Sequence, residues 1–367
     1  MSFPNWFAAE LFSALELRSG DEARPEILEA LHRLNRAYLS ETPSAAGWEQ
    51  KGTHTAYALF YMTQNMPKLG FVLDRAPPST GLTSAADLGC GPGTLLWALA
   101  LREAAAGRPV PKLHGVDNDP KMLEIAARIW ARLRRRLQLP EDHLTLEQGD
   151  WRQRLDLPVD TLMLGNTLVE AGIPDADLLS ALKCRELLLI EPGTSRHFRR
   201  LLELRGHLLG SGWNLGFPCP TAGTCPMSAS GDWCHFRINR LGLPHMQRMA
   251  ALAGRQDPAS AFCGFLFRRG ASELPAGAWR LLSAPRRVSR SVVRLVCDGR
   301  KVDELVLNRK GKAAGNEDFQ QAPAGSLGLL SPAPETAFKR KRLDENQSFR
   351  SLFPPISANL HPTDLAD

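Results

Sequence analysis

The sequence predicts an α/β protein built on a parallel, doubly wound sheet. Apolar runs of five or six residues alternate with helical stretches through the middle of the chain, an order typical of parallel sheets covered on both faces. A glycine-rich segment at residues 87–93 follows one such run and precedes a helical pattern. A strand, a glycine turn and a helix start together favour nucleotide binding, because glycine accepts positive φ and the helix start presents unpaired N–H groups.

The expected elements follow one another regularly along the chain. Apolar residues at helical spacing predict a helix over 26–39, and a second N-terminal helix is expected over 56–73. Strands are expected at 84–89, 112–117, 143–149, 161–166 and 186–191, with helices at 94–105, 120–138 and 195–209. Four segments follow from this order: an N-terminal helical region (1–80), the core (81–211), a cysteine-rich module with a C-terminal β-hairpin (212–310) and a mostly disordered tail (311–367).

Composition indicates a globular protein, and its basic charge is weak evidence for an anionic partner. The 367 residues carry a net charge of +6, and nucleic acid is the usual partner of a basic chain, although a merely solvated basic surface is the alternative. Candidate RNA contacts are the basic stretches 132–136, 196–205 and 339–342. No run approaches the roughly 18 apolar residues of a membrane helix. The acidic first 24 residues do not resemble a signal peptide, so we expect a cytoplasmic protein without a membrane partner.

The spacing of the glycine turn selects among nucleotides. Asp87, Gly89, Gly91 and Gly93 form the pattern D-x-G-x-G-x-G, whereas a dinucleotide fingerprint needs glycine at position 94, where the chain has threonine. The pattern resembles motif I of the class I S-adenosylmethionine (SAM) methyltransferases. In that family the glycines pass under the methionine part of SAM, and the acidic residue orders the loop and the amino group.

Two further acidic positions fit a SAM site. Asp117 ends the second expected strand, where a βαβ unit delivers a carboxylate to a ribose. Asp119 is the weaker candidate, because it precedes Pro120 and suits a helix N-cap. Asp150 ends the third strand; in SAM enzymes this acid contacts the adenine amino group, and the next side chain, here Trp151, often covers the ring. SAM is therefore the expected cofactor.

Catalytic residues are not evident from the sequence. Amino-methyltransferases carry an N/D-P-P-Y loop after the fourth strand, and here that place holds Asn166 and Glu170 as weak candidates. Asn166 could hydrogen-bond a base and Glu170 could accept a proton. No proline pair or aromatic residue follows them, and no cysteine is present there to serve as a nucleophile.

The cysteines predict a metal site. Cys219, Cys225 and Cys234 lie in a stretch rich in Pro and Gly, which suits metal ligation better than packing. Cys297 stands at the tip of an expected hairpin over 291–307 and is our choice as the fourth ligand. Zinc loops usually pair their cysteines as C-x₂₋₄-C, so the wider gaps here favour an iron–sulfur cluster, with zinc as the alternative.

Together these motifs resemble the Rsm-type methyltransferase-like proteins of the small ribosomal subunit, over roughly residues 25 to 310. The motifs are the glycine turn, C-P-x₄-C-P, D-W-C-H-F and a late Cys-Asp-Gly hairpin. Mitochondrial members of that family are small-subunit assembly factors that bind SAM and a four-iron (4Fe-4S) cluster. The resemblance implies cluster ligands at Cys219, Cys225, Cys234 and Cys297, and rRNA contact through basic surfaces.

Three functions remain open on this resemblance. The first is a SAM-dependent methyltransferase acting on the small ribosomal subunit, through rRNA methylation or subunit assembly. The second is a non-catalytic assembly factor that binds SAM and the cluster, and the third is a free methyltransferase with another substrate. We expect a monomer when the protein is away from the ribosome.

Overall fold

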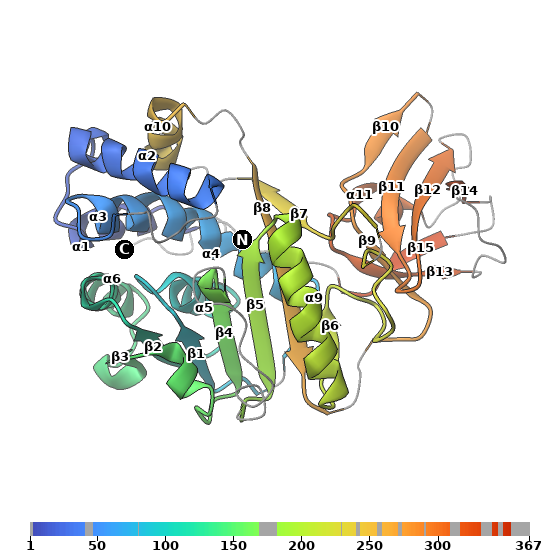
Figure 1. Ribbon diagram of the computed structural model, residues 1–367, viewed down its shortest axis with the longest axis horizontal. Helices are drawn as coiled ribbons and strands as arrows, with labels where there is room; N and C mark the ends of the chain where they lie inside the picture. The colour runs from blue at the N-terminus through green and yellow to red at the C-terminus, as the bar shows by residue number, and fades with distance from the viewer. Residues whose placement is uncertain are drawn as a thin grey trace.

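In the computed structural model, the chain forms two β-sheets, and helices cover both faces of the first (Figure 1). The N-terminal helices group with α10 at one end of the molecule, and the second sheet stands at the other. The structure describes residues 3–40, 47–79, 81–168, 182–228, 230–239, 243–254, 259–270, 274–289, 291–308, 316–331, 340–343 and 348–353.

The first sheet has the strand order β3-β2-β1-β4-β5-β8-β6, and β7 pairs with β8. Its first five strands are parallel, as the sequence predicts, whereas β8 runs antiparallel to β5, β6 and β7. The sheet is therefore mixed rather than wholly parallel. The strands are β1 (Ser84–Leu88), β2 (Lys112–Asp117), β3 (Leu144–Gln148), β4 (Thr161–Gly165), β5 (Glu186–Pro192), β6 (Asn214–Phe217), β7 (Phe236–Asn239) and β8 (Ala259–Arg268).

The helices lie close to the expected positions. The second expected N-terminal helix (56–73) is interrupted by a π-helical segment, η3, between α3 and α4. In the described part of the chain no helix is long and apolar enough to cross a membrane. The helices are α1 (Phe7–Ala14), α2 (Pro25–Leu39), α3 (Thr53–Ala56), η3 (Tyr57–Met62), α4 (Thr63–Leu73), α5 (Thr94–Ala105), α6 (Pro120–Arg136), α9 (Ser195–Gly210) and α10 (Pro244–Leu252), with 3₁₀ turns η1 (Asp21–Ala23), η4 (Glu141–His143) and η5 (Trp151–Arg154).

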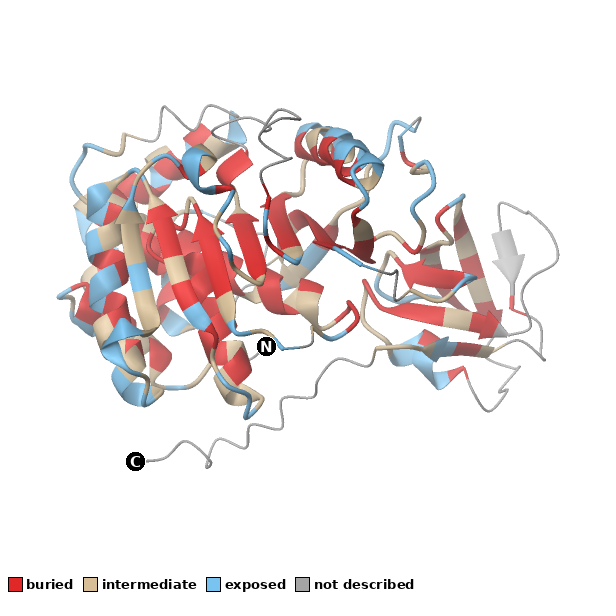
Figure 2. Ribbon diagram, turned by 90° about the horizontal axis from the view of Figure 1, so that it is seen from below, coloured by how far each residue is buried: buried red, intermediate tan, exposed pale blue. Residues whose placement is uncertain are grey.

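The central strands are buried on both faces, as Figure 2 shows, while the edge strand β3 is only partly covered. Alternate residues of a strand point to opposite faces, so the sheet supplies two cores. Ala85 and Met163 join α4, α5 and α6 in one core, and Ala86, Leu88 and Leu162 join α9 in the other. This burial explains why the strands read as continuous apolar runs.

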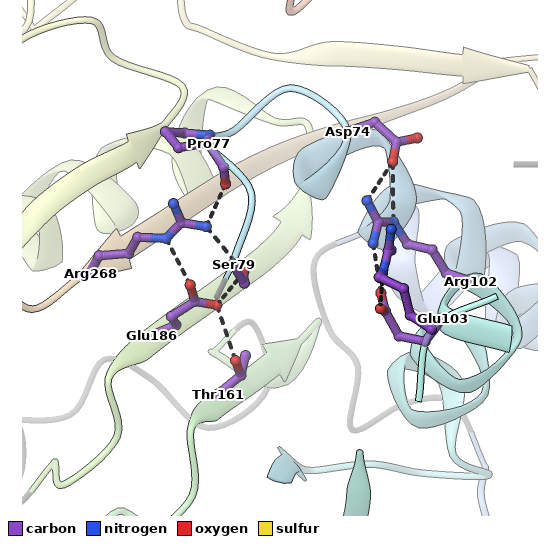
Figure 3. Close-up of polar contacts among 9 residues, drawn as sticks. Asp74, Pro77, Ser79, Arg102, Glu103, Thr161, Glu186 and Arg268 are labelled. Carbon is purple, nitrogen blue, oxygen red and sulfur yellow. Dashed lines mark hydrogen bonds and ion pairs between the residues drawn. The ribbon is translucent and has the colours of Figure 1, made fainter. Parts of the chain in front are cut away.

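An ion pair between Arg268 and Glu186 joins β8 to β5 at the end of the sheet that lies opposite the glycine turn (Figure 3). Arg268 Nε lies 2.8 Å from Glu186 Oε1, and these two residues are register partners. Ser79 and Thr161 donate to the other carboxylate oxygen at 2.9 and 3.1 Å, and Arg268 also donates to the Pro77 carbonyl at 2.6 Å. The pair therefore joins two strands and the segment that leads into the sheet.

The second sheet has the order β14-β12-β11-β9-β13-β15, with β10 paired to β11. The expected hairpin is confirmed as β11 and β12. Strands on both sides of residue 212 belong to the first sheet, so that sheet extends across one of our predicted boundaries; the division into separate segments stays a prediction. The elements are β9 (Ala278–Leu281), β10 (Arg286–Val288), β11 (Ser291–Cys297), β12 (Val302–Asn308), α11 (Glu317–Gln321), β13 (Leu327–Ser331), β14 (Arg340–Arg342) and β15 (Ser348–Ser351).

The tail expected to be disordered contributes to this second sheet where the structure describes it. Phe319 and Phe349 are fully buried in the second sheet's core beside Trp279. The backbone of β13 pairs with β9 and β15. A few well-placed aromatic residues bury enough surface to order this part of a polar segment, and disorder of the rest stays a prediction.

Candidate functional site

The turn between β1 and α5 adopts a conformation that glycine alone accepts easily. Gly89, Gly91 and Gly93 have φ values of 74°, 52° and 89°. A Cβ on Gly89 would lie 2.5 Å from Thr167 Oγ1, and one on Gly93 would lie 2.2 Å from the Trp97 ring. The glycines are thus needed both for backbone shape and for close packing.

A cleft of about 540 Å³ opens beside this turn, at the carboxyl ends of β1 to β4. Ligands of doubly wound sheets bind at this edge. Six of the predicted residues line it: Gly89, Gly91, Asp117, Asp150, Trp151 and Asn166.

Asp117 is held firmly within the cleft. Its Oδ2 accepts from the Gly91 N–H at 2.7 Å, and its Oδ1 accepts from the Asp119 N–H at 2.9 Å. Burial raises the pKa of Asp117, and these two hydrogen bonds oppose that shift. Each carboxylate oxygen keeps a second lone pair, which suits a ligand hydroxyl group.

Asp87 lies behind the turn rather than in the cleft wall. Its side chain is 1% exposed, and its Oδ2 accepts from the Leu95 N–H at 3.3 Å. Its Oδ1 is buried and has no hydrogen-bond partner in the structure. Burial raises the pKa of Asp87 to about 8. Gly93 is likewise absent from the cleft lining, so both residues act through the shape of the turn.

The N-terminal helical region completes the cleft, which the sequence did not indicate. Trp48 and Tyr57 line it, with ring centroids 5.5 Å apart. Asp119 is the N-cap of α6, as predicted, and its Oδ2 also lies 2.7 Å from His54 Nε2. Tyr57 sits in the π-helical segment, and such segments often occur at functional sites. The sequence shows that Trp48 and Tyr57 are aromatic, but no local pattern places them at the cleft.

Asn166 has a left-handed backbone with φ of 59° at the end of β4. Its backbone N–H donates to Ile190 O at 2.8 Å, while its side-chain Oδ1 is buried without a partner in the structure. A strained residue with an unsatisfied buried acceptor is a candidate for ligand contact. Glu170, the other weak catalytic candidate, lies outside the described residues.

The four predicted cysteine ligands come together from distant parts of the chain. Cys219, Cys225, Cys234 and Cys297 all line one pocket between α9 and the second sheet. Burial raises the pKa of Cys219, Cys234 and Cys297. Across the described ranges, however, no group of three or more His, Cys, Asp or Glu side chains is placed to hold a metal ion, so an iron–sulfur module is not shown.

Two buried arginines border the cysteine pocket. Arg205 on α9 donates to the carbonyls of Thr221 and Gly223 at 3.2 and 2.6 Å. Arg280 on β9 is fully buried and donates to the Pro218 carbonyl at 2.6 Å. Burial lowers the pKa of Arg280 to about 9, and the neighbouring cysteines oppose that shift. The loop that carries the cysteines is therefore fixed to both the helix and the second sheet.

Two arginines of the basic stretch at the end of α6 pair within the protein. Arg136 lies 2.8 Å from Glu10 of α1, and Arg134 lies 3.4 Å from Glu141. Arg135 on α6 and Arg199 on α9 are both exposed. Both helices therefore present an exposed arginine to an anionic partner.

The sheet order, the glycine turn and the cleft at the strand ends define a class I methyltransferase-like protein. The sequence matches a family over residues 53–323, which is most of the chain. The chain belongs to the Rsm22 family, described as mitochondrial small ribosomal subunit Rsm22. Our expectation of a cytoplasmic protein is wrong on this finding, because the family is described as mitochondrial.

No curated protein sequence matches the chain. Among solved structures, the chain is 16% identical to the mitomycin 7-O-methyltransferase MmcR, with a TM-score of 0.31. The aligned part covers 72% of this chain and 67% of the MmcR chain. The chain is 13% identical to the geranyl diphosphate C-methyltransferase of Streptomyces coelicolor A3(2), with a TM-score of 0.34. The aligned part covers 61% of this chain and 86% of that enzyme's chain. The methyltransferase-like fold follows from the sheet order and the cleft rather than from these overlaps.

Proposed function

We propose that the chain binds SAM in the cleft beside the glycine turn and acts on the rRNA of the small ribosomal subunit. The observation that carries this proposal is the convergence of Gly89, Gly91, Asp117, Asp150 and Trp151 on one cleft. These residues come from three different strand ends. The family description supports the small ribosomal subunit as the partner, and a net charge of +6 supports contact with RNA.

Each residue has a defined role toward the bound cofactor. Gly91 gives the methionine part close access to the backbone, and Asp117 accepts from the ribose hydroxyls. Asp150 contacts the adenine amino group, and Trp151 covers the ring. Asp87 orders the turn from behind through the Leu95 N–H. SAM supplies an electrophilic methyl group at this edge of the sheet.

Calorimetry tests the cofactor site. Asp117→Ala should weaken SAM binding by about 1–3 kcal/mol, because the ribose hydroxyls lose their acceptor. Asp142→Ala removes an exposed carboxylate outside the cleft and should leave the affinity unchanged. Wild-type protein that binds no SAM would refute the proposal.

The action on rRNA is tested separately. Isolated small ribosomal subunits should take up label from methyl-labelled SAM, and association of the protein with them should weaken as salt rises, because phosphate contacts release counterions. Association without methyl transfer would assign the protein to the non-catalytic assembly factors. The sequence Asn166-Thr167-Leu168, which lacks the proline pair of amino-methyltransferases, is the observation in favour of that second function.

We propose in addition that Cys219, Cys225, Cys234 and Cys297 hold a four-iron cluster. A cluster is several atoms across, so its ligands lie farther apart than those of a single zinc ion, whose Zn–S bonds are about 2.3 Å. Four cysteines from the loop and the second sheet around one pocket supply the number of thiolate ligands that such a cluster needs. The buried guanidinium of Arg280 beside the thiols also favours an anionic centre. Iron and sulfide analysis of anaerobically purified protein decides between the cluster and zinc.

A further inference from the structure

A second cavity adjoins the cofactor cleft. It has a volume of about 260 Å³ and is bounded by α2, η3, α4 and the ends of β5 and β8. Tyr57 and Asn166 line both spaces, so the two are neighbours across these side chains. Ligands the size of a drug usually occupy roughly 300–1,000 Å³. The cleft falls in that range, whereas the second cavity is sized for a smaller group.

One wall of this cavity is aromatic. The chain has three tyrosines, and all of them line it: Tyr38, Tyr57 and Tyr61. The rings of Tyr57 and Tyr61 are stacked, with centroids 5.7 Å apart and planes 26° apart. Tyr38 lies 5.0 Å from Tyr61. A wall of this kind favours a flat ring, because stacking on aromatic side chains accepts any planar base.

Polar, deeply buried side chains of α4, which directly continues η3, also line the cavity. Gln64, Asn65 and Lys68 on α4 are 6%, 5% and 3% exposed. Gln64 Nε2 donates to Ser260 Oγ at 3.2 Å, while Gln64 Oε1 is buried with no partner in the structure. Together with Asn166 Oδ1, two buried acceptors around this cavity lack a donor. Buried polar atoms without partners are uncommon and point to a missing ligand.

The charges of the lining narrow the class of ligand. Lys68 and His197 belong to it, and none of the residues that the structure places in the lining is Asp or Glu. Without a facing carboxylate the cavity does not suit a cationic ligand. Amide side chains donate and accept at once, as the edge of a nucleobase requires, and a lysine can donate to a ring carbonyl.

We propose that this cavity receives one unpaired nucleobase, which stacks on the tyrosine wall and hydrogen-bonds to the amides of α4. The inference rests on the proposed function, because it names the part of the rRNA that reaches the cofactor cleft. A base must leave its helix to enter such a pocket, which favours a single-stranded or loosely paired segment. Asn166 then stands between the base and the cofactor.

Photocrosslinking tests the proposal on full-length protein with S-adenosylhomocysteine bound. Short single-stranded RNAs carry one 4-thiouridine or one 6-thioguanosine, and mass spectrometry maps the crosslinked peptide. We expect crosslinks within residues 57–68. Tyr61→Leu should lower their yield about tenfold, since loss of one stacking side chain commonly has this effect. Tyr61→Phe keeps the ring and should retain most of the yield.

The outcomes separate this inference from the proposed function. S-adenosylhomocysteine affinity and the thermal unfolding midpoint show that the variants are folded. Crosslinks confined to the arginine-bearing face of α9, or equal yields from wild type and Tyr61→Leu, would overturn the base cavity and leave RNA contact intact. Binding of a glutamine-containing peptide at residues 57–68, with no base crosslinks there, would overturn it in favour of a protein substrate. A wild-type protein that binds neither SAM nor S-adenosylhomocysteine would instead refute the proposed function.

Discussion

Gly93 packs its Cα directly against an indole ring. A Cβ there would lie 2.2 Å from Trp97, and φ is 89°, so a side chain meets both a clash and backbone strain. Gly212 has a similar φ of 82° with nothing within 4 Å, so it isolates the strain alone. The difference in stability loss between alanine variants at the two positions therefore measures how tightly the turn packs on Trp97.

We expect Gly212→Ala to lower the free energy of unfolding by about 1–2 kcal/mol, the cost of a left-handed L-residue. Gly93→Ala should cost about 1–3 kcal/mol more, because Trp97 must move in a filled core. Urea denaturation of both variants measures the two values. Equal losses would show that the indole ring yields freely and that packing does not fix this glycine.

Asp87 makes stability depend on pH in a defined direction. Its pKa in the folded protein is about 8, above the usual value of 3.8, because burial disfavours the charged form. The folded state therefore holds a proton that the unfolded state has lost between about pH 4 and pH 8. Stability from this group is present at low pH and is lost as pH rises through that window.

Asp87→Asn keeps the shape of a neutral acid and removes this titration. Between pH 5 and pH 8 the free energy of unfolding of the wild type should fall by on the order of 2–4 kcal/mol relative to that of the variant. This follows from about 1.4 kcal/mol per pKa unit. His245, whose pKa burial lowers to about 4, acts in the opposite direction but is common to both proteins. Denaturation at the two pH values gives the comparison, and parallel curves would contradict a protonated Asp87.

Sequence reasoning placed Asp117 and Asp150 at the cleft because a strand end fixes the position of its last side chain. It did not find Trp48 or Tyr57, because they reach the cleft through packing of the N-terminal region against the sheet. Contacts of that kind depend on tertiary structure and leave no local pattern.

At the scale of elements, Arg268 and Glu186 fasten the antiparallel strand to the parallel part of the sheet. Their side chains are 10% and 13% exposed, so the pair is shielded from water (Figure 3). Removing one partner leaves a buried charge, which costs far more than the pair itself contributes. The exposed pair of Arg286 and Glu304 in the second sheet, 3.0 Å apart, provides the contrast.

Arg268→Met should lower the free energy of unfolding by about 3–5 kcal/mol, because Glu186 then lies buried without its cation. Arg286→Met should cost less than about 1 kcal/mol, since solvent screens that pair. Thermal or chemical denaturation gives both numbers. If the two variants were equally stable, β8 would be held by its backbone pairing and apolar face alone.

The helices and parallel strands were predictable because their apolar periodicity is local. The return of β8 between β5 and β6 was not, since residues 263 and 191 become neighbours only through long-range pairing. The part of the tail that the structure describes was missed for a related reason. Phe319 and Phe349 are few among many polar residues, and only the second sheet gives them a core.

At the scale of the whole molecule, Arg280 stands where three parts of the chain meet. Its guanidinium donates to the carbonyls of Pro218, Arg75 and Gly325 at 2.6, 2.8 and 2.8 Å. These carbonyls belong to the cysteine loop, the end of the N-terminal helical region and the turn that leads into β13 of the second sheet. The cysteine pocket therefore lies at a junction, and a metal centre there would join segments that already share one buried cation.

Cys297 carries the last prediction, because it alone among the proposed ligands comes from the second sheet. It ends β11 and lines the same pocket as Cys219, Cys225 and Cys234 of the loop. Metal binding at such a site is coupled to folding, so loss of one ligand should loosen both segments together. Cys297→Ser should lower iron content and expose residues 219–234 to protease, although they are distant in sequence. Cys184→Ser, in the core beneath α9, should leave iron content unchanged. Full iron in Cys297→Ser with loss in Cys263→Ser would assign the fourth ligand to β8 instead.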